Sequence, residues 1–79
     1  MVMNMRIVER RKKLGYTQIK MQMLTGIDQS EYSKMEKGKR GISMEQCRQI
    51  ALALNTSMDY IAELTDEEKP YPRKNTQDG

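Results

Sequence analysis

Five polar residues in the middle of the chain recur at a spacing that places them on one face of a helix: Gln29, Ser30, Ser33, Lys34 and Lys37. A Gln amide can pair with an adenine edge, a Lys ammonium with the acceptors of guanine, and a Ser hydroxyl with several partners. None of these residues is a nucleophile with a general base beside it, as catalysis would require. The pattern therefore favours recognition by hydrogen bonds and charge over bond-making chemistry.

The elements around this face are two short helices between Thr17 and Arg40 that meet at Gly26. A glycine permits the left-handed backbone that ends one helix and redirects the chain. Thr17 can cap the first helix. Asp28 can cap the second, over about residues 28–37, and Glu31 follows at capping-box spacing. Two amphipathic helices joined in this way follow the plan of a helix-turn-helix DNA reader.

Three further helices are indicated, so the expected fold is all-α with five helices and no strand. Counted along the chain, helix one covers about residues 4–14 and ends at Gly15, before the two helices just described. Helix four opens with a Ser43 and Gln46 capping box and runs to about residue 55. Helix five begins at Ser57. Apolar residues at helical spacing supply the expected core: Ile7, Val8, Leu14, Met21, Leu24, Ile27, Tyr32, Met35, Met44, Cys47, Ile50, Ala51, Leu54, Met58, Ile61 and Leu64.

The length of 79 residues fits one small domain, which we place at residues 1–65. Residues 66–79 become acidic and then polar and proline-containing, and we expect this tail to be disordered. The single cysteine, Cys47, excludes an internal disulfide and a cysteine zinc site.

Charge is distributed unevenly along the chain. Residues 1–48 carry 11 Lys and Arg against 5 Asp and Glu, whereas residues 49–79 carry 3 against 6. The basic residues form an N-terminal cluster (Arg6, Arg10, Arg11, Lys12 and Lys13) and a central cluster (Lys34, Lys37, Lys39 and Arg40). Either cluster alone is compatible with an ordinary solvated helix face, but beside a helix-turn-helix they suit a surface that faces phosphates.

Other functional classes find little support. There is no His, no glycine-rich phosphate loop and no carboxylate pair in a pocket, which argues against an enzyme and against a metal or cofactor. No apolar run reaches the length of a membrane span, and the first residues lack the apolar region of a secretory signal, so we expect a cytoplasmic protein.

Several residues stand in the order and at the spacing typical of one family of five-helix proteins: Thr17-Gln18, Gly26, Ser33, Glu36, Gly38-Lys39-Arg40 and residues 57–61. From about residue 6 to residue 65 the chain resembles the Cro/C1-type (XRE) phage-repressor helix-turn-helix family. The resemblance implies a lambda-repressor-like fold and sequence-specific binding of double-stranded DNA. It further implies a transcriptional regulator, most often a repressor, that acts as a homodimer on a pseudo-palindromic operator.

The resemblance also assigns roles to individual residues. Gln29, Ser30, Ser33 and Lys34 become base contacts in the major groove. Arg11 and Glu36 become a structural ion pair, and Met58, Ile61 and Leu64 the dimer contact. The implied phosphate contacts are Gln18, Arg11, Lys37, Lys39 and Arg40. The chain departs from the family at Gln22, where Ala is usual, and at Thr25, where a larger apolar residue is usual.

An alternative remains open at this point. The same fold can serve an antitoxin or phage-type control protein whose main task is to bind another protein. The acidic run Asp66, Glu67 and Glu68 could then be an arm for that partner, although the sequence favours a solvated terminus. The two functions can be distinguished by DNA binding: a DNA reader requires an affinity that depends on Gln29 and Lys34 and on salt concentration, whereas a protein-binding module does not.

Overall fold

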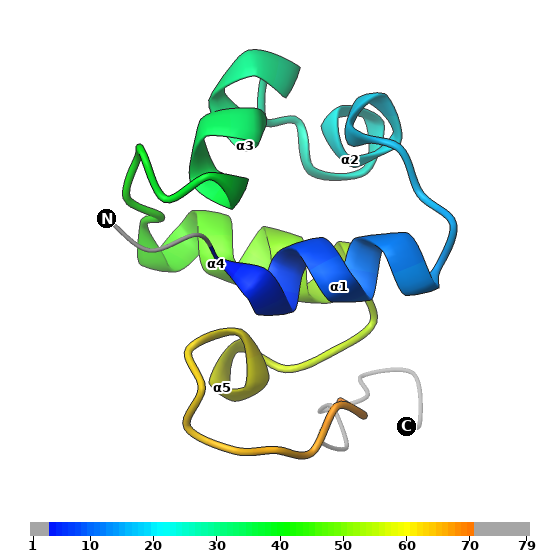
Figure 1. Ribbon diagram of the computed structural model, residues 1–79, viewed down its shortest axis with the longest axis vertical. Coiled ribbons are helices and arrows are strands. Elements are labelled where there is room, and N and C mark those ends of the chain that lie inside the picture. Colours follow the sequence, from blue (N-terminus) through cyan, green and yellow to red (C-terminus); the bar gives the residue numbers. More distant parts are fainter. Residues whose placement is uncertain (1–3, 71–79) are drawn as a thin grey trace, which may run out of the picture.

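A computed structural model describes residues 4–70, and these form five helices and no strand (Figure 1). The predicted all-α, five-helix fold is therefore confirmed. Each helix starts where the sequence places a capping residue, because the side chains of Asn4, Thr17, Asp28, Ser43 and Ser57 all accept a first-turn backbone amide. The helices are α1 (Met5–Lys13), α2 (Gln18–Thr25), α3 (Gln29–Glu36), α4 (Met44–Ala53) and α5 (Met58–Ile61).

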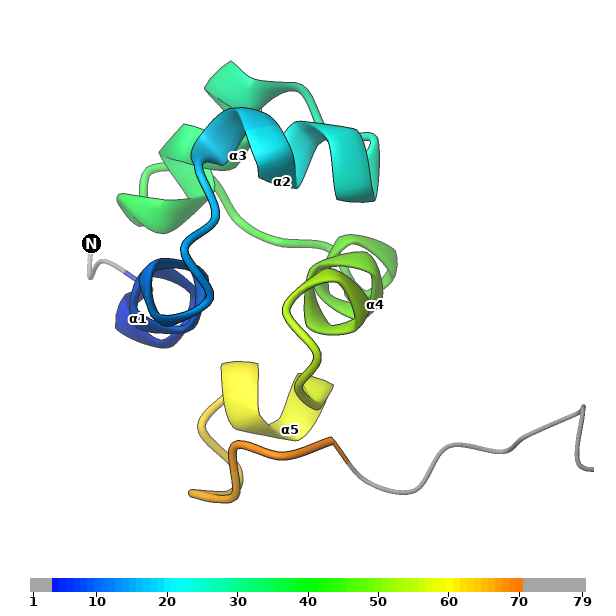
Figure 2. The same ribbon diagram turned by 90° about the vertical axis from the view of Figure 1, so that its right-hand side faces the viewer.

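The helices lie in three levels, which Figures 1 and 2 show from two directions. α1 and α4 occupy the middle, α2 and α3 lie together on one side of them, and α5 with the following residues lies on the other side. α2 packs against α3 and α4, while α1 contacts both α3 and α5. The pair α2 and α3 is thus carried on one side of the molecule with its outer surface open.

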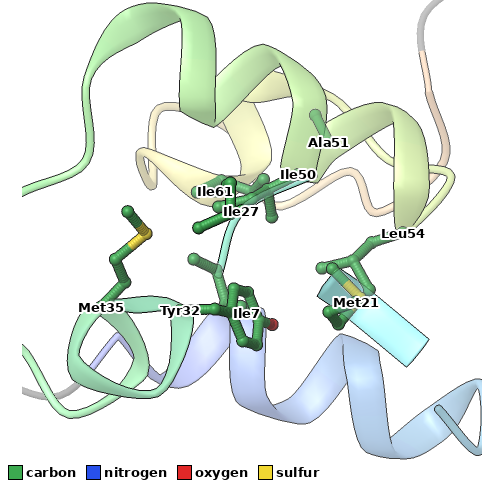
Figure 3. Close-up of a cluster of buried hydrophobic side chains, with 9 residues drawn as sticks. All are labelled: Ile7, Met21, Ile27, Tyr32, Met35, Ile50, Ala51, Leu54 and Ile61. Atoms are coloured by element: carbon green, nitrogen blue, oxygen red, sulfur yellow. The ribbon is translucent and has the colours of Figure 1, made fainter. Parts of the chain in front are cut away.

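The core forms between these levels and takes residues from every helix (Figure 3). Met21 of α2 and Tyr32 of α3 are completely buried, and Ile50 of α4 with Leu54, the residue that follows α4, completes the centre. Partly buried side chains, including Cys47, pack around it. The buried set is Ile7, Met21, Ile27, Tyr32, Met35, Ile50, Ala51, Leu54 and Ile61.

Val8, expected in the core, is only half-buried, and three further residues expected there are exposed. Leu24 is 45% exposed because Met21 and Thr25, four residues apart, take the inward positions of α2. Thr25 is accommodated there because its hydroxyl donates to the Met21 carbonyl at 2.7 Å and accepts from the Ile27 amide at 3.1 Å. Met44 and Leu64, 80% and 76% exposed, lie at the open start of α4 and beyond the end of α5.

One predicted local motif forms and another does not. Ser43 and Gln46 make the expected reciprocal capping box at the start of α4. At the start of α3, the Asp28 carboxylate accepts the Ser30 amide, but within residues 4–70 the Glu31 carboxylate does not accept the Asp28 amide in return. Glu31 lies 3.4 Å from a guanidinium nitrogen of Arg40, so the loop that follows α3 draws its carboxylate away from the helix start.

Residues 65–69, which we term the C-terminal strap, lie along α1. Arg6 donates to the Thr65 carbonyl at 2.7 Å and to the Asp66 carboxylate at 3.1 Å. Glu68 lies 2.8 Å from the Lys13 ammonium and 3.4 Å from the Arg10 guanidinium. The division of the chain at residue 65 and the disorder beyond it stay predictions, and residues 71–79 lie outside the described residues. None of the described helices has the length and apolarity needed to cross a membrane.

Candidate nucleic-acid interface

The turn between α2 and α3 sets the direction in which α3 projects. Gly26 has a φ of 79°, and its amide donates to the Gln22 carbonyl at 2.8 Å, which closes α2. Two residues later Asp28 caps α3, and hydrogen bonds from Ser30 lower the pKa of the Asp28 carboxyl. The Ser30 hydroxyl donates to this same carboxylate, so its donor is already used within the protein.

The exposed and buried faces of α3 follow the predicted helical pattern. Tyr32 and Met35 point into the core and are no more than 1% exposed. On the opposite side Lys34 is exposed, with Gln29 and Ser33 half-buried beside it. α3 therefore presents a polar row to solvent while its other face anchors it in the core.

An ion pair ties the end of α3 to α1. The Arg11 guanidinium donates to both carboxylate oxygens of Glu36, at 2.6 and 3.1 Å, and to the Tyr16 carbonyl at 2.9 Å. Burial, the largest single influence, opposes ionisation of Glu36, but the hydrogen bonds from its neighbours and the charge of Arg11 together outweigh burial and lower the pKa of Glu36. The bond to Glu36 likewise raises the pKa of Arg11. The pair stays charged at neutral pH.

These bonds bear on the two roles implied for Arg11. All three of its terminal-group nitrogens donate within the protein, and its side chain is only 12% exposed. The structure therefore favours the structural role of Arg11 over the phosphate contact, because a phosphate would have to compete with Glu36 and the Tyr16 carbonyl.

Two glutamines of α2 extend this network to the first residue of α3. Gln18 Nε2 donates to Glu36 Oε1 at 3.0 Å, and Gln18 Oε1 accepts from Gln29 Nε2 at 3.0 Å. Gln22 Oε1 accepts the backbone amide of Gln29 at 2.7 Å. Gln18, expected at a phosphate, here connects Glu36 with Gln29.

The network also fixes which way the Gln29 amide faces. A carboxylate can only accept, so Glu36 requires the NH₂ group of Gln18 and leaves Gln18 an acceptor toward Gln29. The NH₂ group of Gln29 must therefore donate to Gln18 Oε1. The Oε1 and one remaining N–H of Gln29 form no hydrogen bond within residues 4–70 and can meet a ligand.

The basic residues separate into two groups. In the central cluster, Lys34, Lys37 and Lys39 are exposed and form no ion pair within residues 4–70, while Arg40 faces Glu31. In the N-terminal cluster, the charges of Arg6, Arg10, Arg11 and Lys13 are matched by Asp66, Glu68 and Glu36. Lys12 of the N-terminal cluster is exposed and has no ion pair within residues 4–70, and otherwise, of these two clusters, the positive charge available to an anionic partner lies in the central cluster.

The three residues predicted at a dimer contact have different environments. Ile61 is only 5% exposed and belongs to the core, so this conformation does not offer it to a partner. Met58 is half-buried and packs against the core. Leu64 is 76% exposed.

Sequence reasoning missed the contact made by Gln22, which it treated only as a departure at the packing between α2 and α3. A signal was present, because Gln22 follows Gln18 by one helical turn and so lies on the same side of α2.

Comparison with known proteins agrees with this geometry. A family model described as helix-turn-helix matches residues 7–61, which is more than half of the chain. Neither the curated proteins nor the solved structures contain a significant match.

Proposed function

The chain belongs to the Cro/C1-type (XRE) helix-turn-helix family of DNA-binding transcriptional regulators, and we propose that it is a homodimeric, cytoplasmic repressor that reads a pseudo-palindromic operator with α3. The observation that carries the proposal is the polar row on the outer face of α3, held in place by Tyr32 and Met35 in the core and by the Arg11 and Glu36 pair.

Gln29 is the proposed reader of adenine. Adenine offers an acceptor, N7, beside a donor, the N6 amino group, in the major groove. The free Oε1 of Gln29 can accept from N6, and its remaining N–H can donate to N7. Guanine offers two acceptors side by side, which a Gln29 amide with one free N–H cannot satisfy.

Lys34, one turn further along the exposed face, is the proposed reader of guanine acceptors, with Ser33 beside it. Lys37 and Lys39 at the end of α3 are placed to bind phosphates, which sets affinity and register but carries no sequence information. Ser30 contributes less than the sequence implies, because its hydroxyl donates to Asp28.

A dimer supplies the contact area that one small domain lacks. Two copies bound one helical turn apart, roughly 34 Å, place both α3 helices in successive major grooves. The exposed Leu64 with the partly exposed Met58 is the proposed centre of the dimer contact, while Ile61 supports it from the core. A dimer bound across a promoter represses most simply by blocking the polymerase.

Alanine substitutions of matched lysines test the proposal. Lys34→Ala is expected to lower the preference for one base pair by about 1–3 kcal/mol on an operator found by selection. Lys39→Ala is expected to weaken binding to all duplexes alike. Lys69→Ala, in the strap on the opposite side from α3, serves as the control and leaves both properties unchanged.

The measurement is equilibrium binding of each variant to the operator, to single-base variants of it and to random duplex. If Lys34→Ala and Lys39→Ala have the same effect on every duplex, the division into reading and anchoring residues is wrong. If none of the three variants alters DNA affinity, the proposed function fails and a protein partner becomes the better explanation.

A further inference from the structure

Gln29 is held by α2 at two points. Its side-chain NH₂ group donates to Gln18 Oε1 at 3.0 Å, and its backbone amide donates to Gln22 Oε1 at 2.7 Å. Gln18 and Gln22 are one turn apart on α2, and Gln29 is the first residue of α3. Two bonds from one rigid helix to the backbone and side chain of one residue restrict both its position and its rotation.

The contact from Gln22 is different in kind from ordinary capping. First-turn amides of a helix have no partner within the helix, and a side chain close in sequence usually satisfies them. Asp28 does so for the Ser30 amide. The Gln29 amide is instead satisfied by a residue seven positions earlier, across the turn at Gly26. This bond therefore fixes the start of α3 relative to α2.

We propose that Gln22 is a positioning residue for the base contact of Gln29. The proposal rests on the proposed function, because it concerns how accurately Gln29 meets its base. Without the Gln22 acceptor, Gln29 keeps only the bond to Gln18 and its backbone gains freedom at the start of α3. A bidentate contact loses strength when the amide can rotate or shift, whereas phosphate contacts by Lys37 and Lys39 are unaffected.

Three variants separate this role from a general structural one. Gln22→Met keeps the length and volume but removes the acceptor. Gln22→Glu keeps an acceptor for the Gln29 amide, and its added charge acts on all duplexes alike. Met23→Ala is the matched control, because Met23 is an exposed neighbour on α2, 73% accessible and outside the network.

The experiment uses the full chain and an operator found by selection, with the base pair read by Gln29 identified through Gln29→Ala. The quantity measured is discrimination, the ratio of Kd values for duplexes that differ only at that base pair. Amide hydrogen exchange of Gln29, measured by NMR without DNA, reports the Gln22 contact directly.

Gln22→Met is expected to reduce discrimination about tenfold, equivalent to about 1.4 kcal/mol, while its affinity for random duplex stays within about twofold. Its Gln29 amide exchanges faster than in the natural chain. Gln22→Glu retains discrimination, and Met23→Ala changes neither property. Combining Gln22→Met with Gln29→Ala reduces discrimination no further than Gln29→Ala alone, because both act through one contact.

Unchanged discrimination in Gln22→Met overturns the positioning role and leaves the proposed function intact. Equal losses in Gln22→Met and Gln22→Glu also overturn it, since the acceptor is then irrelevant. If the natural chain discriminates between no duplexes at all, the proposed function fails, and the positioning role fails with it.

Discussion

At the scale of residues, Glu36 organises the recognition surface. Its side chain is only 5% exposed and accepts from Arg11 and from Gln18. Because a carboxylate only accepts, this one charge determines the orientation of Gln18 and, through it, of Gln29. A buried acid at the end of α3 thus controls which hydrogen-bonding groups the start of α3 presents.

The charge of Glu36 gives stability a defined pH dependence. Its pKa in the folded protein lies below its ordinary value of 4.5, so its contribution is complete above that value and is lost as pH falls through the lower folded pKa. Glu36→Gln is expected to lower the free energy of unfolding at neutral pH by up to about 3 kcal/mol, because Arg11 loses its charged partner.

Urea unfolding of the natural chain and of Glu36→Gln, at a series of pH values from about 3 to about 7, measures this effect. The difference between the two is expected to shrink toward acid pH. Glu45→Gln is the control, because Glu45 also has a lowered pKa but pairs with Arg48 on the surface. A difference that is constant with pH would show that the Glu36 charge contributes nothing.

Sequence reasoning reached some of these residues. The Arg11 and Glu36 pair, which the structure brings within 2.6 Å, came from family resemblance alone. The spacing of Gln18 and Gln22 indicates that they share a side of α2, but their bonds to Gln29 could not be predicted, since these depend on how closely α2 and α3 pack. Helical periodicity gives the face on which a side chain lies but not its partner on another helix.

At the scale of elements, local signals located the helices well. Capping residues marked all five starts, and the Ser43 and Gln46 box formed as expected. The Glu31 box failed because Arg40, from the loop after α3, supplies a partner that no local pattern contains. Short helices also explain the misplacement of Leu24, since eight residues offer only two fully inward positions to a small core.

The turn between α2 and α3 can be tested through its glycine. Gly26 has a φ of 79°, and the space that an added methyl group would fill is open, so an alanine there meets backbone strain and no clash. Gly26→Ala is expected to destabilise the fold by about 1 kcal/mol. Gly41→Ala is the matched control, because Gly41 has equally open surroundings and no positive φ.

Thermal unfolding monitored by circular dichroism compares the two glycine variants. Gly41→Ala is expected to leave the Tm unchanged or slightly higher, since alanine restricts the unfolded chain. Equal Tm values for both variants would mean that the left-handed turn is not needed to join α2 to α3.

At the scale of the whole molecule, the two basic clusters belong to opposite sides. The central cluster lies on α3 and the loop after it, whereas Arg6, Arg10 and Lys13 meet the C-terminal strap on the side of α5. Basic residues of α1 and acidic residues of the C-terminal strap, which are far apart in the sequence, therefore contact each other. Which cluster is free could not be predicted from the sequence, because both are runs of basic residues and the acidic partners of the N-terminal cluster lie far along the chain.

The strap contact is expected to stabilise the fold without affecting DNA binding. Hydrogen bonding by Lys13 lowers the pKa of Glu68, so the contact persists above the ordinary glutamate pKa and weakens as pH falls through the lowered value. Glu68→Lys is expected to lower the Tm in dilute buffer, and less so in about 0.5 M salt, where surface charges are screened.

Glu67→Lys is the control for this variant, because within residues 4–70 the Glu67 carboxylate accepts only the nearby Lys69 amide. Both variants add the same charge, so their general electrostatic effects on DNA affinity match. A Tm that falls equally in the two variants would show that the Glu68 contacts with α1 have no specific role.

Selection from a pool of random duplexes, followed by salt titration on the selected site, shows whether α3 reads DNA sequence. We expect a two-fold-symmetric motif with half-sites about one helical turn apart and an affinity that falls steeply with salt. Weak binding with no enriched sequence would contradict this expectation.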